Sequence, residues 1–130
     1  MIKIPTKLDS DERKRLLESI GPLDGLEVFN NQVLVAVYIR PEKSAGGVYF
    51  ADQTKEEDKW QGKVGLILKM GPTAFDDPDG KWFQGVKIEL NDWVMFRPSD
   101  GWSMTINKNI CRLLDDTAIR GRVQNPQQVY

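Results

Sequence analysis

The segment that most constrains the fold is residues 33–39, where an extended chain would be apolar on both of its faces. Side chains of a strand alternate between two faces. One face holds Val33, Val35, Val37 and Ile39, and the other holds Leu34, Ala36 and Tyr38. A strand that is apolar on both faces is central in its sheet or lies in a subunit interface. The sequence therefore predicts a strand here with no solvent-facing side.

Apolar residues alternate with a period of two along most of the chain after Leu26. The alternating segments are residues 64–70, 86–90, 93–96, 102–106, 110–114 and 119–123. Short turn sequences, such as Asn91-Asp92 and the Asn-Lys-Asn of residues 107–109, separate several of these segments. Six or seven short strands joined in this way predict an all-β protein built as an antiparallel β-barrel.

Residues 1–25 follow a different pattern. Asp9 and Glu12 have the spacing of a helical capping box, and Gly21 with Pro22 ends the segment. Between them Leu16, Leu17 and Ile20 fall on one helical face. We expect a short helix over residues 9–20 in an N-terminal arm, residues 1–25, which docks on the barrel. A dedicated partner helix is the alternative. The barrel domain then covers residues 26–124, and residues 125–130 form a tail.

Length and charge limit the partners. The chain has 130 residues, which suits one domain with one core. Lys and Arg total 18 against 19 Asp and Glu, so no basic surplus exists for a phosphate backbone and nucleic acid is not an expected partner. No apolar run approaches the roughly 20 residues of a membrane-spanning helix, and the first residues lack a signal-peptide apolar segment. We expect a cytoplasmic protein without a membrane partner.

The composition also removes most catalytic chemistry. Cys111 is the only cysteine and histidine is absent, which excludes zinc clusters and nucleophile–histidine pairs. Asp76, Asp77 and Asp79 lack the alternating ligands of a calcium loop and predict a solvated turn. We expect no catalytic residue, no metal and no cofactor, so the chain is not predicted to be an enzyme. Cys111 is expected to be an inert, packed thiol.

Aromatic residues allow two interpretations. Trp60 and Trp82 leave open a module for single-stranded oligonucleotides, because aromatic rings stack on bases. Trp93, Phe96 and Trp102 follow strand alternation, which favours packing in the core.

Two long irregular stretches interrupt the strands, at residues 41–62 and 71–85. Stretches of this length in a compact domain are usually functional or disordered. The first contains two glycines, Gly46 and Gly47, followed by three bulky residues, Val48, Tyr49 and Phe50. These three either fold back into the core or form an exposed segment that orders on a partner.

Several segments resemble the GroES co-chaperonin family in their order and spacing. They are residues 31–35 (Asn-Gln-Val-Leu-Val), 43–50 (Lys-Ser-Ala-Gly-Gly-Val-Tyr-Phe), 62–64 (Gly-Lys-Val), 90–96 (Leu-Asn-Asp-Trp-Val-Met-Phe) and the last strand around Ile119. Residues 43–47 are the most specific of them. The resemblance extends over residues 27–124.

This resemblance implies a GroES-like barrel assembled into a heptamer that caps a GroEL-type chaperonin. By resemblance, residues 41–62 form a mobile loop in which Gly46 and Gly47 are the hinge and Val48, Tyr49 and Phe50 bind the chaperonin. Residues 71–85 correspond to a dome-roof hairpin, and the first strand pairs with the last strand of a neighbouring subunit. The interface residues implied in this way are Val33, Val35, Val37, Ile119 and Val123.

The chain departs from the family pattern at three places. Tyr49 and Phe50 are larger than the aliphatic residues that the family favours, and the arm and the tail have no counterpart in the minimal pattern. Such extensions are similar to those of bacteriophage co-chaperonins, which would add phage capsid proteins as partners. The alternative is a virion structural protein, a head decoration or cement subunit with the same fold.

Overall fold

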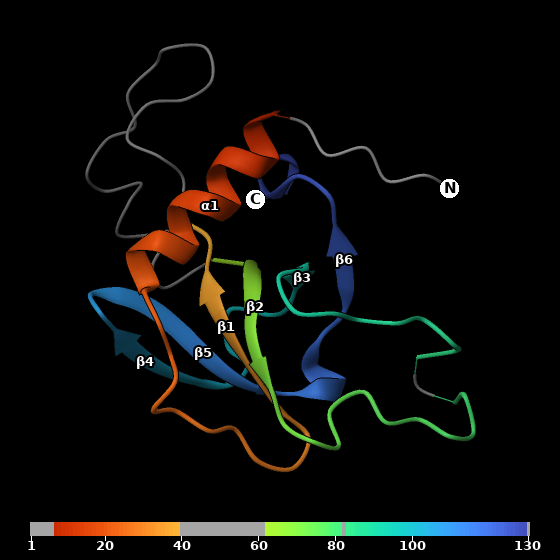
Figure 1. Cartoon of the computed structure of the whole chain (residues 1–130). Coiled ribbons are helices and arrows are strands. Elements are labelled where there is room, and N and C mark those ends of the chain that lie inside the picture. Colours follow the sequence, from red (N-terminus) through yellow and green to blue (C-terminus); the bar gives the residue numbers. More distant parts are fainter. Residues whose placement is uncertain (1–6, 40–61, 82, 130) are drawn as a thin grey trace.

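The computed structural model describes residues 7–39, 62–81 and 83–129 (Figure 1). Within these ranges the chain forms one α-helix, six strands and two short 3-10 helices. They are α1 (Lys7–Ile20), β1 (Gln32–Val37), β2 (Val64–Met70), β3 (Trp93–Met95), β4 (Trp102–Ile106), β5 (Asn109–Asp115), η1 (Asp116–Ala118), β6 (Gly121–Val123) and η2 (Pro126–Gln128). The all-β class is thus confirmed, with a single short α-helix at the N-terminal side.

The six strands form one antiparallel sheet in the order β4-β5-β1-β2-β3-β6. β1 is central, with five residues paired to β5 on one side and five to β2 on the other. A register shift between Leu34 and Val35 interrupts the pairing of β1 with β2, as a bulge does where a sheet bends. β4 and β6 are the two edges of the sheet.

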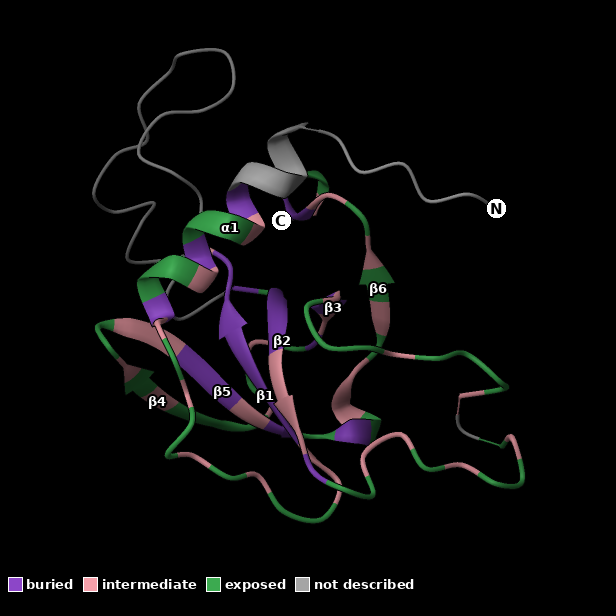
Figure 2. Cartoon of the chain, in the orientation of Figure 1, coloured by how far each residue is buried: buried purple, intermediate pink, exposed green. Residues whose placement is uncertain are grey.

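Both faces of β1 are buried within the subunit, as Figure 2 shows. Leu34, Ala36 and Tyr38 belong to a core cluster that includes residues of α1, whereas Val33, Val35 and Val37 belong to a second cluster on the other face. The exposed fraction of each of the three valines is 2% or less. The prediction of a central strand is confirmed. Assigning Val33, Val35 and Val37 to a subunit interface is corrected, because their own subunit already covers their side chains.

The helix begins at Lys7, two residues before the predicted start, so Asp9 lies inside α1 and does not cap it. Leu16 and Ile20 are buried against the first core cluster, with exposed fractions of 6% and 1%. At its end, Gly21 adopts a φ of +75° and donates its N–H to the carbonyl of Leu17. The helix α1 is therefore docked, as expected of the arm, and it contributes to the hydrophobic core.

Two expected elements differ from the structure. Residues 86–90 form no strand, and Val86 and Leu90 are about half exposed. Positive φ angles at Gln84 and Gly85 turn the chain just before this segment. Within the described part of residues 71–85, consecutive turns stand where the hairpin was expected, and the tract extends away from the sheet (Figure 1).

The aromatic residues divide between the core and the surface. Trp93 and Phe96 are buried, as predicted, and the ring of Trp93 packs edge-to-face on Tyr38 with centroids 5.5 Å apart. Trp102 is 70% exposed, so its prediction as a core residue is wrong. It begins the edge strand β4, which pairs with β5 on one side and with no other strand among the described residues.

Candidate functional site

The predicted chaperonin-binding residues Gly46, Gly47, Val48, Tyr49 and Phe50 lie outside the described residues. The structure does place the two ends of their segment. Val37 of β1 pairs with Gly65 of β2, and the backbone N–H of Tyr38 donates to the carbonyl of Val64 at 2.8 Å. Residues 40–61 therefore connect two neighbouring antiparallel strands, and both ends of the connection are fixed at one end of the sheet.

The helix α1 contacts one end of this connection. The Arg15 guanidinium donates to the Glu12 carboxylate at 2.7 Å and reaches the carbonyl of Ile39 at 3.5 Å. Glu12 is only 6% exposed. A hollow of about 300 Å³ beside this contact is lined by side chains of α1, β5 and the end of β1. The N-terminal arm thus adjoins the point where residues 40–61 leave the sheet.

The base of the 71–85 segment is fixed by hydrogen bonds to other parts of the same subunit. Gly71 donates its N–H to the carbonyl of Gln32 at 2.8 Å, and a Cβ at Gly71 would lie 2.2 Å from the carbonyl oxygen of Asn30. Only glycine fits this approach. The buried carboxylate of Asp116 accepts from the N–H of Phe75 at 2.9 Å. The segment therefore projects from a base that is held in place.

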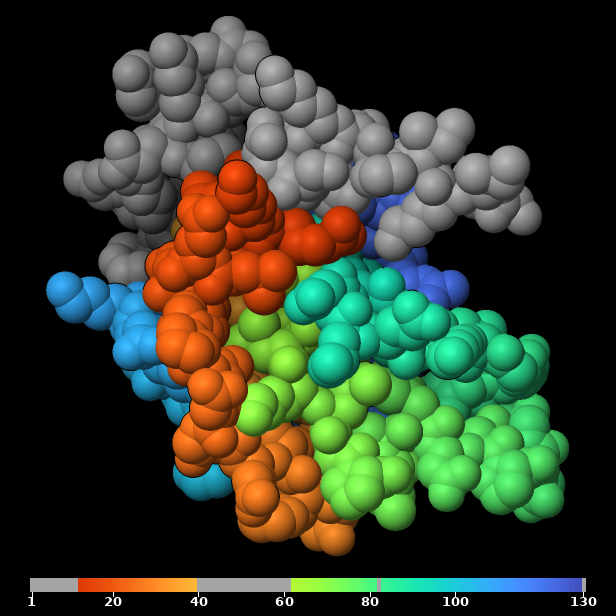
Figure 3. Space-filling model, in the orientation of Figure 1, coloured from red at the N-terminus to blue at the C-terminus, as the bar shows by residue number. Residues whose placement is uncertain are grey.

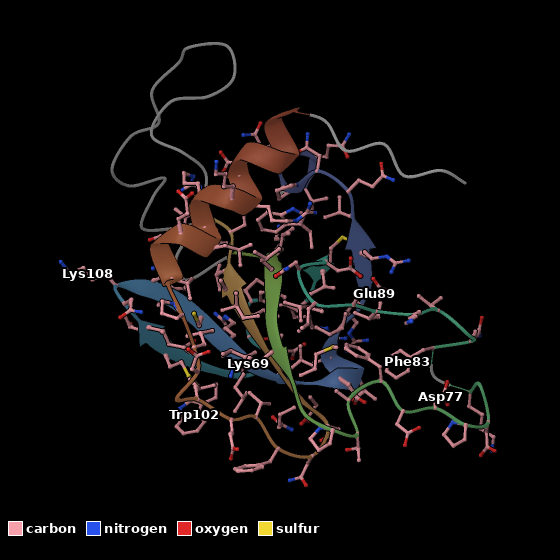
Figure 4. The ribbon with its side chains drawn as sticks, viewed as in Figure 1. Lys69, Asp77, Phe83, Glu89, Trp102 and Lys108 are labelled. Carbon is pink, nitrogen blue, oxygen red and sulfur yellow. The ribbon has the colours of Figure 1, made fainter. Side chains whose placement is uncertain are left out.

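Asp77 closes a turn farther out along this segment (Figure 4). Its carboxylate accepts from the backbone N–H groups of Lys81 and Phe83 at 3.1 and 2.9 Å. The ring of Phe83 packs edge-to-face on Phe75 with centroids 5.2 Å apart. Asp77 and Asp79 thus lie in a turn, as predicted, in which the Gly80 N–H donates to the Asp77 carbonyl. Among the residues that the structure describes, no cluster of three or more potential ligands could hold a metal ion.

Ile119 lies just before the edge strand β6 and Val123 is its last residue, and both are half-buried. β6 pairs with β3 on one side, and Arg122 of β6 donates to the carbonyl of Lys87 at 2.7 Å and to the Asp92 carboxylate at 3.2 Å. A pocket of about 560 Å³ lies between this edge and the projecting segment. Ile119 lines this pocket. Unlike the β1 valines, Ile119 and Val123 are only partly buried, and they stay candidates for a subunit contact.

Two chemically distinctive side chains support the core. Burial raises the pKa of the Cys111 thiol to about 11, so the group is protonated and unreactive at neutral pH. Arg112 is 5% exposed, and its guanidinium donates to the carbonyl of Asp100 at 2.8 Å. Burial lowers its pKa, and the nearby Asp100 carboxylate opposes that shift. Cys111 and Arg112 thus contribute to packing, and neither side chain is a reactive nucleophile.

Comparison with known families decides the classification. The model of the chaperonin 10 kDa subunit matches residues 26–123, about three quarters of the chain. The chain belongs to this family, the GroES co-chaperonins. A search of curated proteins returned no match.

Family membership supports several expectations in their general form. Members are co-chaperonins, they are generally non-catalytic, and the family implies a GroEL-type chaperonin partner and assembly into an oligomer. The helix α1 lies before the matched residues and is therefore an addition to the family core. Within the described ranges, no helix has the length and apolar content needed to cross a bilayer.

Three residues with a clear structural position were not singled out from the sequence: Phe29, Asp116 and Arg120. Phe29 had a signal, because Leu26, Glu27, Val28 and Phe29 alternate and predict one outward-facing aromatic residue if Leu26 and Val28 face inward. Asp116 and Arg120 had none, since carboxylates and guanidinium groups are common on protein surfaces and only the tertiary contacts distinguish them.

Proposed function

We propose that this protein is a cytoplasmic co-chaperonin whose subunits form a seven-membered ring that caps a GroEL-type chaperonin during ATP-dependent protein folding. The single observation that carries the proposal is the family match over residues 26–123. It favours the co-chaperonin over the virion decoration subunit, which no observation supports. In this proposal Ile119 and Val123 contribute to the subunit contacts.

Chaperonin binding is assigned to residues 41–62, with Gly46 and Gly47 as the hinge and Val48, Tyr49 and Phe50 as the contact residues. The attachment of this segment to the paired ends of β1 and β2 supports the assignment, because it begins and ends on the most buried part of the sheet. A rigid base lets a partner pull on the segment without opening the barrel.

The energetics of such a contact explain why several subunits are needed. Burying three apolar side chains provides about 1.5–3 kcal/mol each. Ordering each backbone residue costs about 1–2 kcal/mol, so the two contributions nearly cancel if only the three contact residues and a few neighbours become ordered. One subunit would bind weakly, and a ring would bind well because its linked contacts raise the overall affinity. A lid with this property can also leave the chaperonin.

The test replaces the aromatic contact residues with Tyr49→Ser and Phe50→Ser in one variant. We expect loss of chaperonin binding in the presence of ATP, measured by pull-down, while native mass spectrometry shows an unchanged assembly. A matched control carries Asp79→Ala, an exposed substitution in the 71–85 segment, and binds as the parent protein does. Unchanged binding of the double variant would falsify the assignment.

A further inference from the structure

The hollow between α1, the β4–β5 hairpin and the end of β1 has the size and chemistry of a docking site. Its volume is about 300 Å³, which is within the range of pockets that bind ligands. Its apolar lining residues are buried or half-buried, and most of its polar ones are exposed. The apolar residues are Leu16, Val37, Ile39 and Ile110, and the polar ones are Arg15, Thr105, Lys108 and Asn109. The hollow therefore has an apolar floor and a polar margin.

One wall of this hollow is an addition to the family core. Arg15 and Leu16 belong to α1, which lies before the residues that match the family. The helix is fixed against the hairpin, because Ser19 Oγ donates to Asn109 Oδ1 at 3.1 Å. Figure 3 shows α1 in red to orange beside the β4–β5 hairpin in blue. The hollow is thus a surface that α1 and the sheet form together.

Two cationic side chains reach the margin of the hollow from different elements. The Arg15 guanidinium is held by the Glu12 carboxylate at 2.7 Å, yet the Arg15 side chain is 49% exposed and that of Glu12 only 8%. Lys108 is exposed in the turn between β4 and β5, and no carboxylate within the described residues forms an ion pair with it. The margin is therefore suited to a carboxylate of a partner.

Lys108 also occupies a backbone position that favours glycine. Asn107 and Lys108 form the two-residue turn of the hairpin, with φ angles of +47° and +69°. Such turns need a positive φ at both residues, and asparagine followed by glycine is the preferred pair. The fold therefore keeps a side chain where it costs backbone energy, and Figure 4 shows this side chain pointing away from the subunit. A contact outside the subunit would account for that cost.

The position of the hollow indicates which partner would occupy it. Ile39 lines the hollow and is the last described residue before residues 40–61, which include the proposed chaperonin-binding residues. Arg15 reaches the carbonyl of Ile39 at 3.5 Å. A partner that binds this segment is brought to the same end of the sheet, where the hollow is the adjoining apolar surface.

We propose that this hollow is a second chaperonin contact, which receives an apolar side chain of a GroEL-type chaperonin while a neighbouring carboxylate of that chaperonin pairs with Lys108 and Arg15. The inference rests on the proposed function, because it adds a contact beside the same segment. Charge complementarity and continuity with that segment identify the chaperonin as the occupant. A second copy is disfavoured, because the proposed subunit contacts lie at β6, the opposite edge of the sheet from β4.

The variant Lys108→Gly separates binding from folding. It removes the cation and places glycine at a φ that glycine adopts readily, so we expect a urea midpoint no lower than that of the parent protein. The dissociation constant for a GroEL-type chaperonin with ATP, measured by biolayer interferometry, should rise by about tenfold or more, because a loss in each subunit is multiplied in a ring. Added salt should weaken binding of the parent protein more than that of K108G, since salt screens charge pairs.

Three further variants test the hollow and the charge. Thr105→Trp places a large side chain in the hollow from the exposed edge strand and should also weaken binding by about tenfold or more. Lys108→Glu reverses the charge and should weaken binding more than K108G does. Lys81→Glu makes the same change at an exposed residue of the 71–85 segment and should bind as the parent protein does. Native mass spectrometry checks the assembly of each variant.

The possible outcomes distinguish the inference from the proposed function. If the parent protein binds the chaperonin, the Tyr49→Ser and Phe50→Ser double variant does not, and K108G, K108E and T105W bind like the parent, the inference is overturned and the proposed function remains. Equal losses in K108E and K81E would overturn the site, and so would loss of assembly in K108G, which would place Lys108 in a subunit contact. Full binding by T105W overturns the hollow as the place for an apolar side chain. A parent protein that binds no GroEL-type chaperonin in the presence of ATP overturns both.

Discussion

Asp116 links three parts of the chain through one buried carboxylate. It is 6% exposed; Oδ1 accepts from the Asn31 side chain at 3.1 Å, and Oδ2 accepts from the Phe75 backbone N–H at 2.9 Å. Its own backbone N–H donates to the carbonyl of Asn31 at 3.0 Å. The approach to β1, the base of the projecting segment and η1 are therefore held together at a single residue.

Replacing Asp116 should loosen this junction. Asp116→Ala leaves the Asn31 amide and the Phe75 N–H without their acceptor, and we expect the free energy of unfolding to fall by about 1–3 kcal/mol. Asp116→Asn keeps one acceptor oxygen and should lose less. Urea denaturation followed by tryptophan fluorescence measures the difference, with Asp79→Ala as an exposed control that changes stability by less than about 0.5 kcal/mol. Equal stability of D116A and the parent would show that water replaces the carboxylate.

Single side chains also show where sequence reasoning stops. Trp93 and Trp102 stand in similar alternating segments, yet one is fully buried and the other is 70% exposed. Alternation states which residues share a face, but it does not show whether a strand is central or at the edge of the sheet. The same limit of alternation applies to Val33, Val35 and Val37. Their apolar pattern correctly predicted a central strand but could not show that their own subunit buries them.

At the scale of elements, α1 packs on one face of the sheet and shields it from solvent. Ile20 is 1% exposed, and two turn residues hold this end of the helix: Ser19 Oγ donates to Asn109 Oδ1 at 3.1 Å, and the Asn107 amide donates to the Ile20 carbonyl. Nearer the start of α1, Arg13 Nε donates to the Asn91 carbonyl at 3.1 Å. The helix is thus attached at both the β4–β5 turn and the turn before β3.

Shortening the buried side chain at the end of α1 should therefore lower the free energy of unfolding as much as a core substitution does. Ile20→Ala creates a cavity between helix and sheet, and we expect a loss of about 2–5 kcal/mol in the free energy of unfolding. Chemical denaturation measures it, and Glu18→Ala, an exposed position in the last turn of the helix, serves as the matched control. A detachable arm would instead give a separate early transition in the parent protein and almost no change in the main one.

Elements were predictable where local signals and tertiary partners agree. β1, β2, β4 and β5 follow the predicted alternation, because each finds a neighbouring strand. Residues 86–90 alternate equally well but form no strand in the described structure. The Asp92 carboxylate accepts from the Glu89 N–H at 3.0 Å, and the Arg122 guanidinium donates to the Lys87 carbonyl. Side chains therefore satisfy backbone groups that would otherwise pair with a neighbouring strand. The start of α1 was misplaced because a capping-box spacing occurs inside the helix.

At the scale of the whole molecule, the proposed function depends on how weak contacts combine. The family implies an oligomer with a chaperonin partner, and each subunit contributes one copy of the segment between β1 and β2. If each contact alone is near energetic balance, affinity belongs to the assembly and not to the subunit. The substitutions at Tyr49 and Phe50 should then act through the number of intact segments in each ring.

Mixed rings test this dependence. Unfolded parent subunits and subunits carrying both Tyr49→Ser and Phe50→Ser are combined in graded ratios and reassembled, and native mass spectrometry confirms that the subunits mix. We expect chaperonin binding with ATP to fall more steeply than the fraction of parent subunits, because linked contacts raise affinity by about 10²–10⁴ over a single one. Mixing with Asp79→Ala subunits should leave binding constant at every ratio. A decline in simple proportion to the parent fraction would mean that each segment binds independently, and the cap would then need a stronger contact elsewhere on the molecule.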